Sequence, residues 1–277
     1  MKAAAFEYIR AQSVEEVCAT LGDDAMVIAG GQTLVPLMAM RLARPSLLVD
    51  INDIAALKGI SAANGVIEIK ACTRQSDALA SDIVKNRLPL LAKALPFVGH
   101  GQTRNRGTVG GSIALGDPSA EIPLVAVALD AKILLRTVKG TRTVDAAQFF
   151  KAAMQTARAA DECLESVSFL VWEGRVGTGF QEVAERQGDF AVVSACAQVA
   201  RDVSGKVTRA SVAVGGASPT PVRLDGIEAL LDGQHEAEIT ALVDRAIDPS
   251  DDGHATAAYR RRVAPKLVAR AIAEAMA

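Results

Sequence analysis

The chain has 277 residues, of which 50% are hydrophobic and 4% aromatic, and its formal net charge is -2. This length predicts two domains, or one large domain with an added module, and the charge gives no support for binding to nucleic acid or to an anionic membrane surface. No apolar run approaches the ~20 residues that a membrane span needs, and the sequence shows no secretory signal. We therefore expect a cytoplasmic protein.

The four cysteines are far apart and form neither a CxxC pair nor a cluster with histidine at metal-ligand spacing. We expect Cys18, Cys72, Cys163 and Cys196 to be reduced, mostly buried thiols. Neither an iron–sulfur cluster nor another metal site is predicted on this chain. No nucleophile and base stand together as in nucleophilic catalysis, so we predict no catalytic side chain. A redox cofactor that brings its own chemistry fits such a sequence.

The first fifty residues predict a βαβ-like unit. Ser13–Leu21 has the capping residues and the apolar spacing of a helix. Met26–Ile28 is a short apolar run typical of a buried strand, and Leu47–Ile51 predicts the next strand. Pro36 suits the first turn of a helix between the two strands. A strand should therefore end just before residue 29, and a helix should begin a few residues later.

The turn between them carries the first glycine pair, in the run Ala29-Gly30-Gly31-Gln32-Thr33-Leu34. Such a turn leaves backbone N–H groups unpaired, and glycine lets a ligand approach the main chain closely, which suits phosphate. The run is neither GxGxxG nor followed by GK[ST], so it predicts neither a Rossmann fingerprint nor a P-loop. A plain structural turn is the alternative.

The chain reaches a second glycine pair, Thr108-Val109-Gly110-Gly111-Ser112, after several further elements. We predict, in order, a strand at 66–71, helices at 77–83 and 89–98, and a polar loop at 99–107. Both glycine pairs are flanked by hydroxyl or amide side chains that can donate to phosphate oxygens. Two such loops converging on one diphosphate would form a nucleotide cofactor site.

Charged side chains accompany the second pair. Asp117 and Glu121 follow it, and a carboxylate there could accept hydrogen bonds from ribitol or ribose hydroxyls. The alternative is that Asp117 caps a helix and that Glu121 is solvated. His100, Arg104 and Arg106 precede the pair and could steer an anionic cofactor, or they could simply lie in a solvated loop.

The rest of the chain predicts a mixed region followed by an antiparallel meander. The mixed region comprises a helix at 122–129, a strand at 132–136, a helix at 144–153 and a strand at 164–171. A boundary is expected at 172–175. The meander comprises strands at 180–186, 190–201 and 207–214, followed by short helices at 226–231 and 238–247 and a final helix that contains 263–272.

The two glycine motifs, with Asp117-Pro118 and Glu121 behind the second, resemble the FAD-binding medium subunit of molybdenum hydroxylases, the family of carbon monoxide and xanthine dehydrogenases. The resemblance covers the whole chain. It implies an α+β fold: a p-cresol methylhydroxylase-type FAD-binding domain at 1–174, with two α/β subdomains at about 1–55 and 56–174. It also implies a C-terminal domain of the carbon monoxide dehydrogenase flavoprotein type at 175–277, built of antiparallel sheet plus helices.

The resemblance also implies the residues that bind FAD. They are Val27, Ile28, Ala29, Gly30, Gly31, Gln32, Thr33 and Leu34 in the first loop, Thr108, Gly110, Gly111 and Ser112 in the second, Glu121 at the cofactor hydroxyls, Val98 and Gln102 in a less regular contact region, and Phe169 and Phe190 at the flavin. Ordinary core packing is the alternative for Phe190. Many relatives carry a lysine shortly after the aromatic position of Phe180, where this chain has Gln181 and Glu182.

The function that the resemblance implies is electron transfer within a heterotrimer. A large subunit would hydroxylate the substrate at a molybdopterin-type cofactor, and a small subunit would pass electrons through [2Fe-2S] clusters to the FAD on this chain. The flavin would then reduce an external acceptor. A dimer of heterotrimers is implied as well, whereas the substrate and the acceptor stay open. The alternatives are a stand-alone flavin oxidase or dehydrogenase of the same superfamily, and a flavin-free scaffold.

Overall fold

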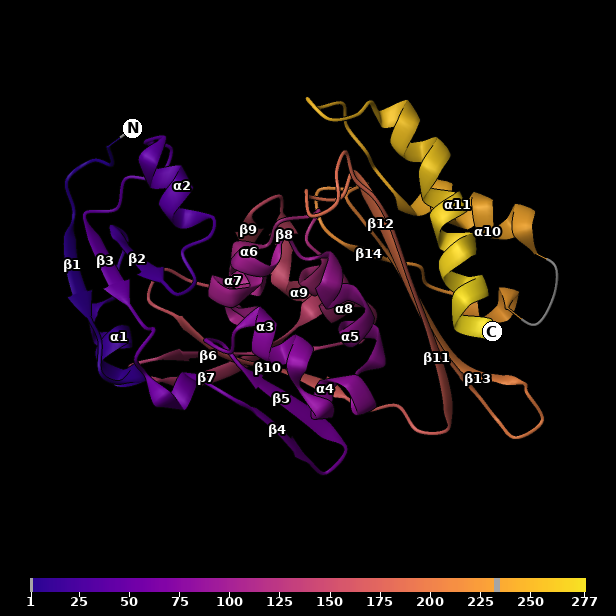
Figure 1. Cartoon of the computed structure of the whole chain (residues 1–277), viewed down its shortest axis with the longest axis horizontal. Coiled ribbons are helices and arrows are strands. Elements are labelled where there is room, and N and C mark those ends of the chain that lie inside the picture. Colours follow the sequence, from indigo (N-terminus) through magenta and orange to yellow (C-terminus); the bar gives the residue numbers. More distant parts are fainter. Residues whose placement is uncertain (1, 232–234) are drawn as a thin grey trace.

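The computed structural model describes residues 2–231 and 235–277. Three larger β-sheets follow one another along the longest axis of the molecule (Figure 1), and β8 and β9 form a further two-stranded sheet. A small N-terminal sheet lies at one end, a larger sheet lies in the middle beneath a group of short helices, and a C-terminal sheet lies at the other end under α10 and α11. Among the described residues, no helix is both long and apolar enough to cross a membrane.

The N-terminal sheet is parallel, with the strand order β1-β3-β2. Its elements are β1 (Glu7–Arg10), α1 (Val14–Thr20), β2 (Ala25–Ile28), α2 (Leu34–Ala39) and β3 (Leu47–Asp50). The predicted βαβ unit is confirmed, because β2 and β3 pair in parallel with Ile28 opposite Asp50. The carboxyl ends of these two strands therefore lie side by side. This is the edge at which open parallel sheets bind ligands.

The middle sheet is antiparallel, with the order β4-β5-β10-β6-β7. Its strands are β4 (Ile60–Ala63), β5 (Val66–Lys70), β6 (Lys132–Thr137), β7 (Gly140–Asp145) and β10 (Cys163–Leu170). The other elements of this part are α3 (Gln75–Ala80), α4 (Asp82–Arg87), α5 (Pro89–Ala94), α6 (Gly101–Arg106), α7 (Val109–Leu115), α8 (Glu121–Ala128), α9 (Ala146–Phe149), β8 (Phe150–Ala152), β9 (Gln155–Thr156) and 3₁₀ turns at Ala55–Leu57 and Leu95–Phe97. Every residue of α8 is buried. A helix covered on all sides needs no polar face, which explains its apolar sequence.

Two predicted elements in this part are wrong. The segment 99–107 is not a loop, because it contains α6. No residue of α6 is buried, so the helix has no apolar stripe and gives no periodic signal. The segment 144–153 is not one helix: Val144 ends β7 opposite Ile133, and only the four residues of α9 are helical. Pairing with β6 prevails there over the local helical pattern.

The C-terminal sheet is an antiparallel meander, as predicted. It contains β11 (Arg175–Val183), β12 (Val193–Arg201), β13 (Val207–Gly215) and β14 (Val222–Arg223), followed by a 3₁₀ turn at Ile227–Leu230 and by α10 (Glu236–Ala246) and α11 (Ala257–Met276). One face of the sheet, with Phe180, Cys196 and Ala213, joins the core of the middle part. The other face packs under α11 in a separate core. All four cysteines are buried and free, as predicted.

Helix α11 packs directly on the backbone of β11. A Cβ atom at Gly179 would overlap the Ala271 carbonyl oxygen and lie 2.8 Å from the carbonyl carbon. We expect Gly179→Ala to lower the free energy of unfolding by about 2–3 kcal/mol, because the helix must move away from the sheet. Chemical denaturation would measure this loss. Gly253→Ala, at a position with open space, is the matched control; equal stability of the two variants would contradict the prediction.

Candidate FAD-binding site

The two glycine loops lie against each other. We call 29–33 the first glycine loop and 106–111 the second glycine loop. A Cβ atom at Gly30 would overlap the carbonyl oxygen of Arg106 and would lie 2.8 Å from the Cα atom of Gly107. The two main chains therefore touch at Gly30, and only glycine permits this approach. The convergence expected from the sequence is present.

The first glycine loop offers unpaired backbone donors. The N–H groups of Gly30, Gly31, Gln32 and Thr33 donate no hydrogen bond to any described residue. The loop is nevertheless fixed in shape, because the Gly31 carbonyl accepts from the Val35 N–H at 3.0 Å and Gly31 has a φ of +69°. A run of free N–H groups in a preformed turn is an arrangement that binds phosphate.

The second glycine loop differs, because the backbone donors of its glycine pair and of Val109 are already used. The Val109 N–H donates to the Thr73 carbonyl at 3.0 Å, the Gly110 N–H to the Ala71 carbonyl at 2.9 Å, and the Gly111 N–H to the Thr108 hydroxyl at 3.0 Å. A Cβ atom at Gly110 would lie 2.5 Å from the Cα atom of Ala71. Gly110 therefore serves packing on the turn after β5. Ser112, which is half-buried, and the exposed Gly111 form the part of this loop that a ligand can reach.

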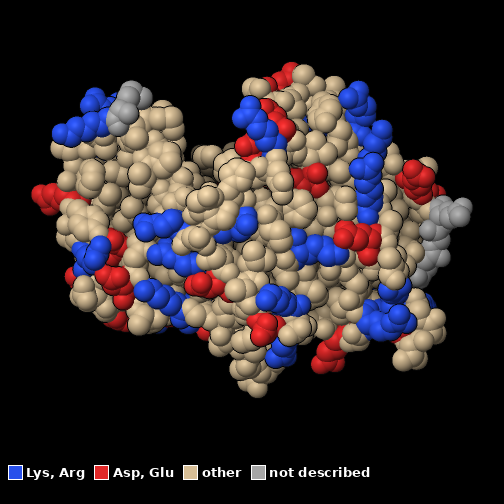
Figure 2. Space-filling view, viewed as in Figure 1, with Lys and Arg blue, Asp and Glu red and all other residues tan. Residues whose placement is uncertain are grey.

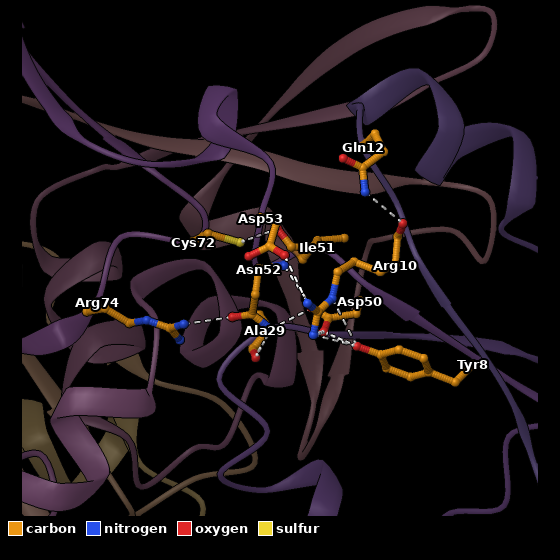
Figure 3. Close-up of polar contacts among 10 residues, drawn as sticks. All are labelled: Tyr8, Arg10, Gln12, Ala29, Asp50, Ile51, Asn52, Asp53, Cys72 and Arg74. Atoms are coloured by element: carbon orange, nitrogen blue, oxygen red, sulfur yellow. Dashed lines mark hydrogen bonds and ion pairs between the residues drawn. The ribbon is translucent and has the colours of Figure 1, made fainter.

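Polar side chains connect the two loops from behind (Figure 3). The amide nitrogen of Asn52 donates to the Ala29 carbonyl at 2.7 Å and to the Asp50 carboxylate at 2.6 Å. The amide oxygen of Asn52 accepts from Nη2 of Arg74 at 2.7 Å. The Nη1 atom of Arg74 donates to the Arg106 carbonyl, which is the group that touches Gly30. A continuous chain of hydrogen bonds therefore joins the start of one loop to the start of the other.

Two carboxylates, the buried Glu121 and the half-buried Glu182, lie at the beginning of α8 and on β11. Glu121 is only 4% exposed, and burial raises its pKa to about 7, with Asp117 adding to the rise and Arg104 opposing it. Burial likewise raises the pKa of Glu182 to about 8, with a contribution from Glu121. One Glu182 oxygen is buried and has no hydrogen-bond partner among the described residues. The alternative of a solvated Glu121 is therefore wrong.

Asp117 does not cap α8. Its carboxylate accepts from the Ser119 N–H at 2.9 Å and closes a turn ahead of the helix, whereas the cap position is Ala120.

Arg104 is not in a solvated loop, since its Nη1 atom donates to the Val98 carbonyl at 2.9 Å and to the Gly99 carbonyl at 2.7 Å. These contacts fix the chain at the start of α6.

The remaining predicted residues divide between the site and the core. Val27 and Ile28 end β2, Leu34 begins α2, and Gln102 is exposed on α6. Val98 is buried. Phe190 is 59% exposed, so the core-packing alternative for it is wrong. Phe169 is 0% exposed and lies in β10 opposite Ile67, inside the middle sheet. The structure therefore places Phe169 in the core, away from the molecular surface.

The molecule is hollowed at this place. Figure 2 shows a depression between the lobe that carries α2 and the lobe that carries the start of α11, and α6 and α7 lie beneath it in Figure 1. The loop between β11 and β12 reaches the same region, because a Cβ atom at Gly188 would lie 2.5 Å from the imidazole ring of His100. Residues of the middle part and of the C-terminal part thus contribute to one concave surface.

Sequence reasoning missed Asn52 and Arg74 as members of this region, and it noted Glu182 only as a departure from the lysine that many relatives carry there. Asn52 carried a signal, since it follows Asp50 at the carboxyl end of a parallel strand. Arg74 carried none, because its partner Arg106 lies 32 residues away in the sequence, and the proximity of Glu182 to Glu121, 61 residues away, had no signal either.

Two family models together match almost the whole chain. A model described as FAD binding domain in molybdopterin dehydrogenase matches residues 4–169, and a model described as CO dehydrogenase flavoprotein C-terminal domain matches residues 178–275.

Curated proteins and solved structures show the same likeness over full length. The chain is 35% identical to the 6-hydroxypseudooxynicotine dehydrogenase complex subunit alpha of Paenarthrobacter nicotinovorans, over 100% of this chain and 96% of that protein. It is 34% identical to the caffeine dehydrogenase subunit beta of Pseudomonas sp. (strain CBB1), over 99% and 96%. Among solved structures, a chain of reconstituted CO dehydrogenase from Oligotropha carboxidovorans matches with a TM-score of 0.96 and 30% identity, over 100% of this chain and 99% of that one.

Proposed function

Because the chain belongs to the family of FAD-binding medium subunits of molybdenum-containing dehydrogenases, we propose that it is the electron-transfer subunit of a three-subunit oxidoreductase. In this proposal a large subunit holds a molybdopterin-type cofactor and oxidises the substrate. A small subunit with [2Fe-2S] clusters passes the electrons to FAD on this chain, and an external acceptor takes them from there. The relatives named as subunits of dehydrogenase complexes support this assignment.

The observation that carries the proposal is the set of free N–H groups at Gly30–Thr33, preformed beside the second glycine loop. A diphosphate needs several donors that converge without intervening side chains, and this loop offers them. A flavin-free scaffold has no use for such donors or for a glycine at a backbone contact. The residues present therefore fit FAD.

When bound, FAD would accept electrons one or two at a time and pass them on. The N–H groups of the first loop would hold its diphosphate, with the Ser112 hydroxyl adding a donor from α7. Glu121 would accept from the hydroxyls of the cofactor. Phe190, exposed on the loop after β11, would contact the flavin ring from the C-terminal side. No side chain of this subunit is assigned acid–base work on the organic substrate.

Substrate choice belongs, in this proposal, to the large subunit. The two relatives at 35% and 34% identity are named for 6-hydroxypseudooxynicotine and caffeine, and the structural match at 30% identity is named for CO. Substrates as different as two nitrogen heterocycles and CO, at similar identity, are what we expect if this subunit does not bind the substrate. We further propose a domain division at 174/175, assembly as a dimer of heterotrimers, and a cytoplasmic location.

The first test is the visible absorption spectrum of the purified chain, with the released cofactor identified after denaturation. We expect one FAD per chain, with flavin bands and no iron–sulfur absorbance. In the assembled complex, anaerobic addition of substrate should bleach the flavin, whereas the chain alone should stay oxidised. Reduction of the chain alone by an organic substrate would favour a stand-alone enzyme. A chain that takes up no FAD, alone or with its partners, would overturn the proposal.

A further inference from the structure

The geometry assigns Asn52 and Arg74 as positioning residues that set the distance between the two glycine loops and thereby the shape of the diphosphate site. This inference rests on the proposed FAD function. Neither residue lies in a glycine motif, and neither needs to touch the cofactor. They would act by holding the Ala29 and Arg106 carbonyl groups, which flank the point where the two main chains meet.

The two loops are not held equally by the rest of the fold. The second glycine loop is bonded tightly to the turn after β5, since three of its groups bond to Ala71, Thr73 and Gln75: the N–H groups of Val109 and Gly110 donate and the Gly107 carbonyl accepts. The backbone bonds of the first glycine loop are to its own helix: the Gly31 and Thr33 carbonyls accept from the Val35 and Leu37 N–H groups of α2, and the N–H groups of the loop have no partner among the described residues. Its position therefore depends on side chains. Asn52 supplies the bond to Ala29.

Chemistry fixes the direction of every bond in this bridge. The Ala29 carbonyl and the Asp50 carboxylate only accept, so the NH₂ group of Asn52 must face them. The Asn52 oxygen then faces Arg74, which only donates. Arg74 spans two acceptors with two different nitrogens, Nη1 on Arg106 and Nη2 on Asn52. A lysine would bring the same charge as a single ammonium point and cannot span both acceptors in this way.

Asp50 anchors the bridge to the sheet. Its carboxylate accepts from the Asn52 N–H at 2.8 Å as well as from the Asn52 amide, and Tyr8 donates to its other oxygen. Arg10 lies 3.6 Å from the same carboxylate. Hydrogen bonding by Tyr8 and Asn52 outweighs burial and holds the pKa of Asp50 below its ordinary value. Asn52 is therefore held in one rotamer from the strand side while it holds Ala29 on the other.

The test compares FAD binding and the diphosphate environment in matched variants of the 277-residue chain after removal of the flavin. We expect Arg74→Met and Asn52→Leu each to raise the Kd for FAD by about 10- to 100-fold, as loss of charge-assisted hydrogen bonds predicts. Arg74→Lys should recover only part of this loss. The double variant should be weakened by much less than the product of the single effects, since both act through one bridge.

A readout besides affinity separates positioning from general destabilisation. In Arg74→Lys with saturating FAD, the ³¹P resonances of the bound diphosphate should shift from their wild-type positions while the thermal midpoint stays near that of the wild type. Arg44→Lys is the control, because this exposed arginine bonds, within the described part of the chain, only to the Arg41 carbonyl. It should leave both the Kd and the ³¹P spectrum unchanged.

The outcomes separate this inference from the function on which it rests. A wild-type chain that takes up no FAD under any condition would overturn the proposed function together with the inference. A wild-type chain that binds FAD, with Arg74→Met and Asn52→Leu within twofold of its Kd, would overturn the inference alone. So would full recovery by Arg74→Lys with unchanged ³¹P resonances, because charge rather than the two-point bridge would then be sufficient.

Discussion

Replacing Gly30 with alanine is expected to weaken FAD binding strongly while leaving the chain folded. The added Cβ atom would overlap the Arg106 carbonyl oxygen and would lie 2.8 Å from the Gly107 Cα atom. Both are main-chain atoms of the tightly held second loop, so no flexible side chain can yield. The first loop must move away by about 1 Å to restore ordinary contact distances. A shift of that size weakens several of the charge-assisted hydrogen bonds from the loop N–H groups to the diphosphate. We therefore expect the Kd for FAD to rise on the order of 100-fold.

Titration of the flavin-free chain with FAD, followed by flavin fluorescence, would measure this loss. Circular dichroism and the thermal midpoint should stay close to wild type, because the first glycine loop lies at the surface edge of its sheet. Gly22→Ala is the matched control: it is a glycine of the same subdomain with no atom within 4 Å of the added Cβ position. Retention of wild-type FAD affinity by Gly30→Ala would show that the loop contact does not shape the site.

The sequence was sufficient for those features that depend on neighbouring residues. The strand Ala25–Ile28, the glycine turn and α2 follow from an apolar run, two glycines and a proline within a dozen residues. The meander of β11, β12 and β13 was also predictable, since each strand has its own alternating or apolar pattern and turn residues separate them.

The features that sequence patterns did not give depend on tertiary contact. The different roles of the two glycine pairs are one such feature. Gly110 is needed because the turn after β5 lies against it, and no local sequence pattern indicates that neighbour. The burial of Phe169 in the middle of a five-stranded sheet is another, because it requires the strand order of that sheet. The Asn52–Arg74 bridge joins residues 22 positions apart and forms only once two sheets are in place.

The proximity of Glu121 and Glu182 is of the same kind, and it leads to an expectation about pH. Burial raises both pKa values, to about 7 and about 8, from an ordinary value of 4.5. The folded chain therefore keeps protons that the unfolded chain releases near pH 4.5. Because the folded state then binds more protons, the stability of the flavin-free chain should fall as the pH rises from about 4.5 to 8. For Glu121, a rise from 4.5 to about 7 corresponds to about 3 kcal/mol.

Glu182→Gln removes one of the two charges and should change this pH dependence. At pH 5 the carboxyl of Glu182 is protonated in the folded chain, so the variant and the wild type should unfold at nearly the same temperature. At pH 8.5 the wild type carries the buried Glu121 carboxylate and the half-buried Glu182 carboxylate, and the glutamine variant should unfold at a temperature several degrees higher. Glu173→Gln, at an exposed position beyond the middle sheet, is the control and should match the wild type at both pH values.

Thermal unfolding of the flavin-free chain at the two pH values provides the measurement. The quantity that matters is the difference between variant and wild type, since groups elsewhere that change charge in this range, such as His254, are present in both proteins. Asp117 and Arg104 are the other charged groups that act on Glu121, with opposite signs. They are present in both proteins and do not create the difference. A gain in midpoint that is the same at pH 5 and pH 8.5 would show that the glutamine acts through packing, and it would contradict a raised pKa of Glu182 at this site.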